Sequence, residues 1–286
     1  MPSNEMKAFP EVEKYLLSLR NRGSKYGIDR MRLLLAALDH PERVFPIIHV
    51  AGTNGKGSVC AMMEGILRGS GLKVGMLTSP HLIRLGERIQ VNRRAIADEE
   101  IASLTKRLKP MVDQLAASDP ENQPSFFELI IGMGFMTCQR EKVDVAVVET
   151  GLGGRLDATN VVEPILSIIT SVGLDHVAHL GNDLRSIAKE KAGIVKPNAP
   201  VVIGRMPAEA KEEILEIASG REARVFEVEN IFPHAPDDLP KTNLEGTFQR
   251  WNAGTALVAS KVLEQRFGLN DSSVRQPLAT VEWGGR

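Results

Sequence analysis

Short apolar runs recur along the chain, and longer amphipathic or apolar stretches separate most of them. Each run is short enough to be a buried strand, and the stretches between them are long enough for helices. The predicted strands are residues 44–50, 73–78, 144–149, 165–170 and 200–204. Because such alternation is typical of parallel sheets covered on both faces, we predict an α/β fold with a mainly parallel sheet flanked by helices.

Two of the intervening helices have N-terminal signals in the sequence. Ser125 and Glu128 have the spacing of a capping box, in which each side chain accepts the other residue's backbone N–H. Asn182 and Asp183 are candidate caps for the next amphipathic stretch. A last helix is expected near residues 248–267, after a segment rich in Pro, Asp and Asn.

The composition is that of an ordinary globular protein. The chain has 286 residues, 43% of them hydrophobic, and a formal net charge of −1. It therefore has no overall positive field for nucleic acid or an anionic membrane, and neither is an expected partner. Cys60 and Cys138 are expected to be buried, reduced thiols. The N-terminus has acidic residues and no apolar signal-peptide core, and no run reaches membrane-spanning length, so we expect a cytoplasmic protein.

The segment "HVAGTNGKGSVC" follows the first predicted strand and leads into a helical stretch. A strand, a glycine-rich turn and a helix can surround an anion with backbone N–H groups, while a lysine, here Lys56, reaches the outer phosphates. The glycines that would allow this approach are Gly52, Gly55 and Gly57. The common pattern G-x-x-x-x-G-K-[ST] fails twice, at Val50 and at Gly57. On the loop alone, a glycine-rich turn with Lys56 in solvent remains an alternative.

Three polar residues fall at the ends of predicted strands, where open α/β sheets place ligand chemistry. They are Ser79, Glu149 and His176. A hydroxyl, a carboxylate and an imidazole could together hold Mg²⁺, although imidazole is an unusual ligand for so hard a cation. Taken singly, each residue could equally be a turn hydroxyl, a solvated strand end or a hydrogen-bonded loop histidine.

Other polar clusters carry less information. His176 and His179 have i, i+3 spacing, but no neighbouring Cys or His completes a zinc site, so zinc is not expected. At least two of three nearby lysines are interpreted as a charged helix face; the three are Lys189, Lys191 and Lys196. The glycine-rich segment 151–160, with Arg155 and Asp157, has the composition of a loop that closes on a ligand.

Taken together, these motifs resemble one family, the folylpolyglutamate synthase and dihydrofolate synthase branch of the Mur ligase superfamily. In the family's order, the matching segments are "HVAGTNGKGS", "TSPHL", "ERIQVN", "SFFE", "VVETGLGGRLDATN", "TSVGLDHVAHLG" and "IAKEKAGIVK". They extend from near residue 26 to about residue 204, and a weaker match continues through "FQRWNAGTA" to "WGGR". The departure of the phosphate loop from the common pattern is itself the Mur ligase form.

The resemblance implies a P-loop NTPase-like central domain and an ATP-dependent ligase that adds L-glutamate to a folate, with dihydropteroate as a further candidate acceptor. The acceptor carboxylate would take the γ-phosphoryl group, and the amine of glutamate would attack the acyl phosphate. Lys56 and the N–H groups of residues 55–58 would stabilise the phosphates. The ATP-binding residues implied are Thr53, Asn54, Gly55, Lys56, Gly57, Ser58, Asn252 for the adenine nucleotide and Arg286 for the phosphates.

The match also implies two Mg²⁺ sites. Ser79, Glu149 and His176 would be ligands, and Lys191 corresponds to the lysine that the family carbamylates, which would support the second ion. The catalytic residues implied are Lys56, Lys191 and His176. The folate-binding residues implied are Tyr26, Gly27, Ile28, Ser125, Phe126, Phe127, Glu128, Leu156, Asp157 and Ala158, with a phenylalanine ring for stacking.

The family normally has a smaller Rossmann-like domain after a "GR" linker, and the matching "WGGR" ends this sequence. We therefore expect residues 1–286 to form the ATP-binding domain, with a core at about 26–268 and the start of a linker at 269–286. The glutamate-ligase domain is expected to be absent or supplied separately, and the chain is expected to be a monomer.

Two alternatives remain open from the sequence. One is another Mur-type amide ligase that acts on a cell-wall peptide precursor, against which "SFFE" and "GLGGRLDATN" argue. The other is a nucleotide-binding module without complete ligase activity.

Overall fold

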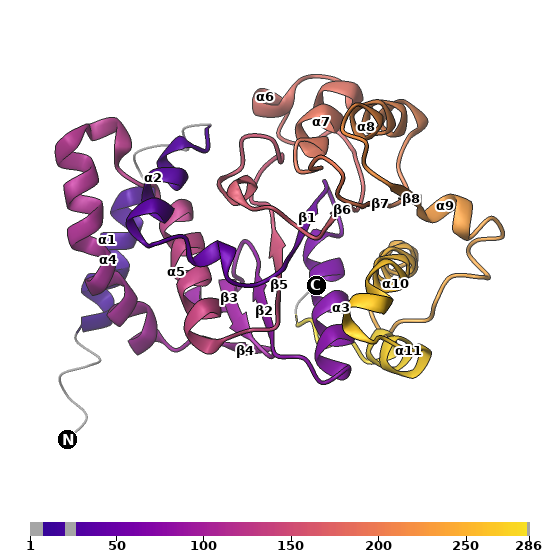
Figure 1. Ribbon diagram of the computed structural model, residues 1–286, viewed down its shortest axis with the longest axis horizontal. Helices are drawn as coiled ribbons and strands as arrows, with labels where there is room; N and C mark the ends of the chain where they lie inside the picture. The colour runs from indigo at the N-terminus through magenta and orange to yellow at the C-terminus, as the bar shows by residue number, and fades with distance from the viewer. Residues whose placement is uncertain (1–7, 21–26, 285–286) are drawn as a thin grey trace.

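A central, mainly parallel sheet organises the computed structural model, which describes residues 8–20 and 27–284 (Figure 1). Within those residues the strand order is β4-β3-β2-β5-β1-β6-β7-β8. The strands are β1 (Ile47–Ala51), β2 (Val74–Leu77), β3 (Ile89–Val91), β4 (Arg94–Ala95), β5 (Val145–Glu149), β6 (Leu166–Ile169), β7 (Val201–Ile203) and β8 (Val225–Glu227). Among the strand pairs of the described residues, β2–β3 and β3–β4 are antiparallel and the others are parallel. The predicted α/β class with a mainly parallel sheet flanked by helices and all five predicted strands are confirmed.

Helices cover both faces of the sheet (Figure 1). The α-helices are α1 (Ala8–Arg20), α2 (Asp29–Ala37), α3 (Lys56–Gly69), α4 (Asp98–Ser118), α5 (Phe126–Glu141), α6 (Val177–Leu180), α7 (Leu184–Ala192), α8 (Ala208–Gly220), α9 (Val228–Ile231), α10 (Thr247–Phe267) and α11 (Asp271–Ala279). Short 3₁₀ turns are η1 (Pro41–Arg43), η2 (Leu85–Arg88), η3 (Pro120–Asn122) and η4 (Ala158–Val161). One face packs against α3, α10 and α11, and the other against α1, α2, α4 and α5 near β2 and against α7 and α8 near β7.

The strands in the middle of the sheet are mostly apolar because both of their faces are buried. In β1, Ile48 and Val50 point into the core under α3 and α10, whereas Ile47 points into the core under α5. Val147 and Val148 of β5 divide between the same two cores. Successive side chains of a strand point to opposite faces, so a strand between two helical layers is apolar at most of its positions.

Three short strands were not predicted from the sequence. β3 and β4 extend the sheet beyond β2 as antiparallel edge strands, and β8 extends it beyond β7. The segment "IQVNRRA" that forms β3 and β4 has few apolar residues, and its alternation of apolar and polar residues is too short to predict a strand. Its extended conformation depends on pairing with β2, which only the folded chain supplies.

Both predicted helix starts are confirmed. Ser125 caps α5 with both bonds of the capping box: the Glu128 N–H donates to Ser125 Oγ at 3.3 Å, and the Ser125 N–H donates to Glu128 Oε2 at 2.6 Å. Asp183, the second of the two candidates, caps α7 by accepting the Ser186 N–H at 2.8 Å. Each cap satisfies N–H groups that have no partner within the helix.

The packed core reaches beyond the expected limits of residues 26 and 268. Leu16 of α1 is buried under α5, and Leu278 of α11 is buried against α3. Half of the segment expected to begin a linker is therefore helical, and this helix is packed against α3. Its amphipathic spacing, Val274 with Leu278, was obscured in the sequence by Pro277 inside the helix. The domain assignment itself stays a prediction.

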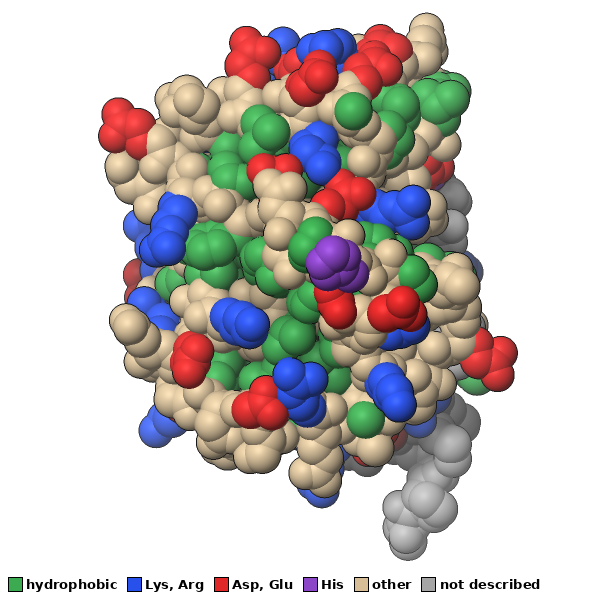
Figure 2. Space-filling model, turned by 90° about the vertical axis from the view of Figure 1, so that its right-hand side faces the viewer, with side chains coloured by type: hydrophobic (Ala, Val, Ile, Leu, Met, Phe, Trp, Pro, Cys, Tyr) green, Lys and Arg blue, Asp and Glu red, His purple; other side chains and the backbone are tan. Residues whose placement is uncertain are grey.

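Two other features bear on the sequence predictions. Cys60 and Cys138 are buried, free thiols as predicted, and burial raises the pKa of Cys138 to about 12. Among residues 8–20 and 27–284, no helix is both long and apolar enough to cross a membrane. Acidic and basic side chains are interspersed on the face that carries α8 to α11 (Figure 2), as the net charge of −1 leads one to expect.

Candidate functional site

The glycine-rich loop joins β1 to α3 at the carboxyl edge of the sheet. Gly52 and Gly55 have φ of +156° and +85°, and Gly55 caps α3 directly before Lys56. A Cβ on Gly52 would lie 1.9 Å from Thr170 Oγ1, and one on Gly55 would lie 2.3 Å from Asn252 Oδ1. Glycine is therefore required at both positions, and the loop presents the N-terminus of a 14-residue helix.

The segment after β6 holds this loop in place. The Thr53 N–H donates to the Ser171 carbonyl at 2.8 Å, and the Asn54 N–H donates to Ser171 Oγ at 3.0 Å. The Thr170 hydroxyl donates to the Asn54 carbonyl at 2.6 Å. Thr53 and Asn54 therefore use their N–H groups to shape the loop. The N–H groups of the first turn of α3 are those that a helix leaves for an external acceptor.

Lys56 lies over the loop. Its ammonium donates to the Gly52 carbonyl at 2.9 Å and to the Thr53 carbonyl at 3.3 Å. The structure therefore does not show the alternative in which the Lys56 side chain extends into solvent. An anion in the loop would compete for this ammonium with two neutral carbonyls, and a bond between two opposite charges is the stronger one.

A buried polar chain connects the loop helix to α10. The Gln249 side-chain N–H donates to Ser58 Oγ at 3.2 Å, and the Asn252 side-chain N–H donates to Gln249 Oε1 at 2.9 Å. Because Ser58 Oγ accepts a bond here, its own hydroxyl hydrogen remains available to a phosphate or a metal-bound water. Gln249 was not predicted as a site residue. The only signal was its place three residues before Asn252 on one helical face.

Two of the three predicted metal ligands lie together. Ser79 follows β2 and Glu149 ends β5, and these strands are neighbours in the sheet. The Ser79 N–H donates to Glu149 Oε2 at 2.9 Å, and Glu149 is only 2% exposed. The carboxylate and the hydroxyl of this pair are oxygen ligands of the kind that Mg²⁺ prefers.

His176 occupies a different environment. It precedes α6 with φ of +47°, and its side chain is more than half exposed. Its Nε2 lies 3.7 Å from Asp175 Oδ1. Within the described ranges, no group of three or more His, Cys, Asp or Glu side chains is placed to hold a metal ion. The role of His176 as a ligand stays a prediction.

Lys191 is a buried lysine near the phosphate loop. It lies in the last turn of α7 and is 2% exposed, unlike the exposed Lys189. Burial and, to a lesser extent, the nearby charge of Lys56 lower the pKa of Lys191 to about 8, against the opposing charge of Asp175. Lys191 thus departs from the charged helix face, and it shares an electrostatic environment with the loop lysine. Lys196 lies beyond the end of α7, so the helix-face interpretation, made for at least two of the three lysines, holds for Lys189 alone.

The glycine-rich segment after β5 packs on the turn that carries Lys191. The Arg155 N–H donates to the Glu190 carbonyl at 2.7 Å, and the Arg155 guanidinium pairs with the Glu190 carboxylate at 2.8 Å. A Cβ on Gly154 would lie 2.7 Å from the Glu190 carbonyl oxygen and 2.9 Å from that of Lys191. The small residues predicted to serve close approach do so against α7.

Asp157 holds the same loop from inside. Its carboxylate accepts the Leu152 N–H at 2.8 Å, the Thr159 N–H at 2.9 Å and the Thr159 hydroxyl at 2.5 Å. Thr159 Oγ1 in turn lies 2.8 Å from Nε2 of the buried His49, whose pKa burial lowers to about 3. Asp157 therefore shapes the loop between the half-buried Leu156 and the buried Ala158, and any contact it makes with a ligand would be secondary to that role.

Two segments far apart in the sequence meet at the start of α5. Arg30 Nε donates to Glu128 Oε1 at 3.1 Å, which places the start of α2, with Gly27 and Ile28 before it, beside the Ser125 cap. The Arg88 guanidinium lies 5.3 Å from the centroid of the Phe126 ring.

The predicted residues Tyr26 and Arg286 lie outside the described ranges.

The Phe127 ring faces the 151–158 loop, the glycine-rich segment that follows β5. A Cβ on Gly151 would lie 2.6 Å from Phe127 Cζ, so the ring packs directly on the loop backbone. The start of α5 and the loop after β5 are thereby in contact. Three segments predicted to bind one substrate, the start of α2, the start of α5 and the 151–158 loop, are brought together by the fold.

Comparison with known proteins was made at the level of sequence and of structure. No protein-family model matches the chain. It is 38% identical over 301 residues to the dihydrofolate synthase/folylpolyglutamate synthase of Bacillus subtilis (strain 168), which covers 98% of this chain and 70% of that protein. It is 34% identical to the folylpolyglutamate synthase of Lacticaseibacillus casei, over 97% of this chain and 70% of that protein. It superposes with a TM-score of 0.85, at 29% identity, on a folylpolyglutamate synthase complex with AMPPCP and folate, over 97% of this chain and 73% of that one.

Proposed function

This chain belongs to the folylpolyglutamate synthase and dihydrofolate synthase family, and we propose that it uses ATP to join L-glutamate to a folate. The observation that carries this function is the 38% identity with a dihydrofolate synthase/folylpolyglutamate synthase over 98% of the chain. The alternatives weighed from the sequence, a different Mur-type ligase or a module without ligation, are not favoured by any observation.

The reaction proceeds in two balanced steps. A folate carboxylate oxygen attacks the γ-phosphorus of ATP, a P–O bond forms, and ADP leaves. The amine nitrogen of glutamate then attacks the acyl carbon, an amide forms, inorganic phosphate leaves, and the nitrogen loses a proton. Lys56 and the N–H groups of the first turn of α3 stabilise the charge that develops on the transferred phosphoryl group. Asn252, whose side chain lies against Gly55, is assigned a contact with the nucleotide on its match to the family.

The side chains at the carboxyl edge of the sheet fit a magnesium ion. Glu149, held by the Ser79 N–H, offers a buried carboxylate oxygen, and the Ser79 hydroxyl offers a second. His176 is assigned as a further ligand on its match to the family. When bound, Mg²⁺ supplies neutralisation of the phosphate oxygens during transfer. The hydrogen bond between Ser79 and Glu149 joins the ends of β2 and β5 at the proposed metal site and does not depend on the ion.

Lys191 fits the role of a carbamylated lysine. Only a neutral amine reacts with carbon dioxide, and burial brings the pKa of Lys191 to about 8, where a substantial fraction is neutral near physiological pH. Carbamylation forms an N–C bond and replaces a cation by an anion, so two protons are released: one when the ammonium becomes the reactive amine, and one from the nitrogen after it has bonded to carbon dioxide. That change would remove the repulsion between Lys191 and Lys56 and provide an oxygen ligand for a second Mg²⁺.

The folate is assigned to the surface where the starts of α2 and α5 meet the 151–158 loop. The half-buried rings of Phe126 and Phe127 offer stacking surfaces for a pterin, and Arg88 beside Phe126 offers a cation to the carboxylates of the folate. The relative from Bacillus subtilis is named for both dihydrofolate and folylpolyglutamate synthesis, so dihydropteroate is proposed as a second acceptor.

The test is incorporation of labelled L-glutamate, measured with tetrahydrofolate, with dihydropteroate and with a UDP-linked muropeptide as separate acceptors. ATP-dependent incorporation into a folate is the expected result, and incorporation into the muropeptide alone would overturn the proposal. Because the chain spans 70% of the Bacillus subtilis relative, the assay is repeated with the remaining portion of that relative supplied as a separate polypeptide. ATP binding without turnover in either assay would instead support the nucleotide-binding module.

A further inference from the structure

Arg93 occupies a backbone conformation that favours glycine. It joins β3 to β4 together with Asn92, and the two residues have φ of +69° and +48°. Two successive left-handed residues make the tight hairpin turn for which Asn-Gly is the preferred sequence. Asn is tolerated there, but an arginine must place its Cβ against the backbone. A disfavoured residue persists at such a position when its side chain makes compensating contacts.

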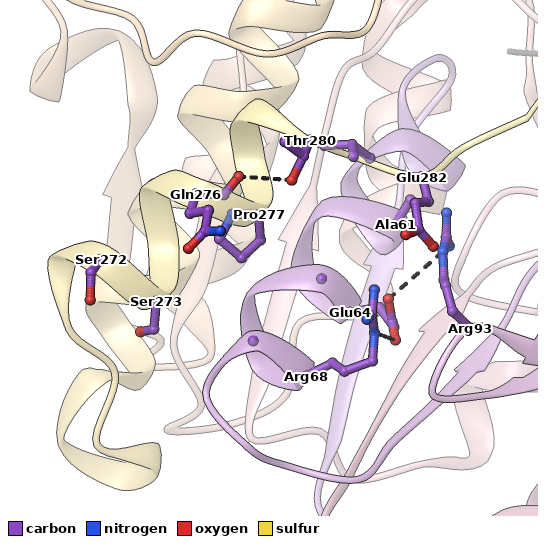
Figure 3. Close-up of a pocket in the computed structure, with 13 residues that line it drawn as sticks. Ala61, Glu64, Arg68, Arg93, Ser272, Ser273, Gln276, Pro277, Thr280 and Glu282 are labelled. Atoms are coloured by element: carbon purple, nitrogen blue, oxygen red, sulfur yellow. Dashed lines mark hydrogen bonds and ion pairs between the residues drawn. The ribbon is translucent and has the colours of Figure 1, made fainter.

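The Arg93 side chain makes contacts on two sides. It is 11% exposed, and its Nε lies 3.8 Å from Oε2 of Glu64, in the middle of α3. Its guanidinium lies 5.1 Å from the centroid of the Trp283 ring, near the end of the described chain. Figure 3 shows the side chain reaching between Glu64 and Glu282. Arg93 thus joins the helix that begins at the phosphate loop to the segment after α11.

Glu64 needs a cation at this place. It is fully buried, Arg68 Nε donates to its Oε1 at 2.9 Å, and its Oε2 has no hydrogen-bond partner among the described residues. Burial raises the pKa of Glu64, and Arg68 and Arg93 oppose that rise. Burial lowers the pKa of Arg93, and the carboxylates of Glu64 and Glu282 oppose that fall. Because a buried carboxylate is unfavourable without a counter-charge, Arg93 is held where it is.

Arg93 and Glu282 also separate two cavities. One, of about 220 Å³, lies between α3 and α11 and is lined by Glu64, Arg68 and Gln276 among others (Figure 3). The other, of about 570 Å³, is lined by Thr78 and Pro80, the neighbours of Ser79 in sequence, and by Trp283. Arg93 and Glu282 line both. Movement of the Arg93 side chain would change the wall of the cavity next to the proposed metal site.

We propose that Arg93 is a positioning residue, which ties residues 281–284 to the phosphate-loop helix and so fixes one wall of the cavity beside Ser79. The kinetic consequence rests on the proposed function, whereas the structural tie does not. Without Arg93, Trp283 loses its cation and the 281–284 segment is held by fewer contacts. Binding of MgATP must then also order this cavity wall. Because that ordering costs free energy, the KM for ATP rises more than kcat falls.

The structural arm of the test uses the fluorescence of Trp283. The chain has two tryptophans, so Trp251→Phe leaves Trp283 as the single reporter. In that background Arg93→Gly suits the turn but removes the tie. The emission of Trp283 should shift to longer wavelength, and quenching by acrylamide should increase about two- to tenfold, as expected when a cation–π contact is lost. Arg94→Gly, at the exposed neighbouring residue, is the matched control and should leave both unchanged. Unaltered quenching in folded Arg93→Gly would overturn the proposal.

The kinetic arm compares Arg93→Gly and Trp283→Leu in the otherwise unaltered chain. Trp283→Leu keeps the Arg93–Glu64 pair, so it tests the tie even if Arg93→Gly fails to fold. Both variants should raise the KM for ATP about three- to tenfold with a smaller change in kcat. A KM at the wild-type value in folded Trp283→Leu would overturn the positioning role. If the wild-type chain itself does not ligate, the proposed function fails, and the fluorescence arm alone decides the structural tie.

Discussion

The backbone N–H of Ser79 donates a 2.9 Å hydrogen bond to Oε2 of Glu149, although 70 residues separate the two in the chain. The contact exists because β2 and β5 are neighbouring parallel strands whose carboxyl ends lie at one edge of the sheet. It fixes a buried carboxylate next to a hydroxyl, close to the phosphate loop. The predictions below test this edge of the sheet and the groups around it.

Glu149→Gln should separate binding of the metal from folding. The amide oxygen can still accept the Ser79 N–H, but the negative charge is lost. We expect ATP turnover at fixed Mg²⁺ to fall at least about 100-fold and the half-saturating Mg²⁺ concentration to rise, because a charged ligand is lost. The melting temperature should stay close to that of the wild type. Glu216→Gln, at an exposed carboxylate on α8, is the control, and an unchanged Mg²⁺ dependence of Glu149→Gln would contradict the assignment.

Lys191→Met should stabilise the chain while abolishing ligation. The folded-state pKa of Lys191, about 8, lies below the ordinary lysine value of 10.5, so the unfolded chain binds more protons between these values. The folded protein is therefore penalised by up to about 3 kcal/mol below pH 8, and the penalty disappears as the pH rises toward 10.5. Urea denaturation in buffer depleted of carbon dioxide should show Lys191→Met to be the more stable protein at pH 7.

The pH dependence of that difference is the control for Lys191. The stability advantage of Lys191→Met should shrink between pH 8 and pH 10.5, and bicarbonate should stabilise the wild type alone. A Lys191→Met protein that is less stable than the wild type at pH 7 would show that the ammonium is well solvated or paired.

Gln249→Leu should weaken ATP turnover through Ser58. The amide N–H that donates to Ser58 Oγ is lost, and the serine hydroxyl is then free to turn away from the phosphates. A double-mutant cycle with Ser58→Ala should give a coupling free energy of about 0.5–3 kcal/mol in log(kcat/KM), because the residues act as a unit. Additive effects would place Gln249 outside the nucleotide machinery. Ser260→Ala, at a buried hydroxyl elsewhere on α10, is the control.

Gly151→Ala should affect the folate more than ATP. The new methyl group would lie 2.6 Å from Phe127 Cζ, so the ring must move away from the loop. We expect the KM for folate to rise about tenfold, equivalent to roughly 1.4 kcal/mol of lost binding, while the KM for ATP changes little. Gly220→Ala, where a Cβ meets no atom within 4 Å, is the control. Equal effects on both substrates would indicate a general disturbance of the loop.

Much of the candidate site could be predicted because local patterns specify it. The ends of apolar runs located Ser79 and Glu149, and the capping spacing located Ser125 and Glu128. Gln249 could not be predicted, because a glutamine on a long helix has no distinguishing neighbour in sequence. Its partner Ser58 is 191 residues away, and only the packing of α10 on α3 makes the bond.

The sequence by itself determined the α/β class, the five main strands, the phosphate loop and the family, because apolar period, glycine placement and motif order are properties of the chain. The tertiary structure decided which of several lysines is buried. It also decided that Arg93, in the turn between β3 and β4, contacts both α3 and the segment after α11. Lys189 and Lys191 stand two residues apart on one helix, yet one is exposed and the other buried with a lowered pKa. Burial and charge proximity depend on what packs against a residue, and for Lys191 and Arg93 the packing comes from distant parts of the chain.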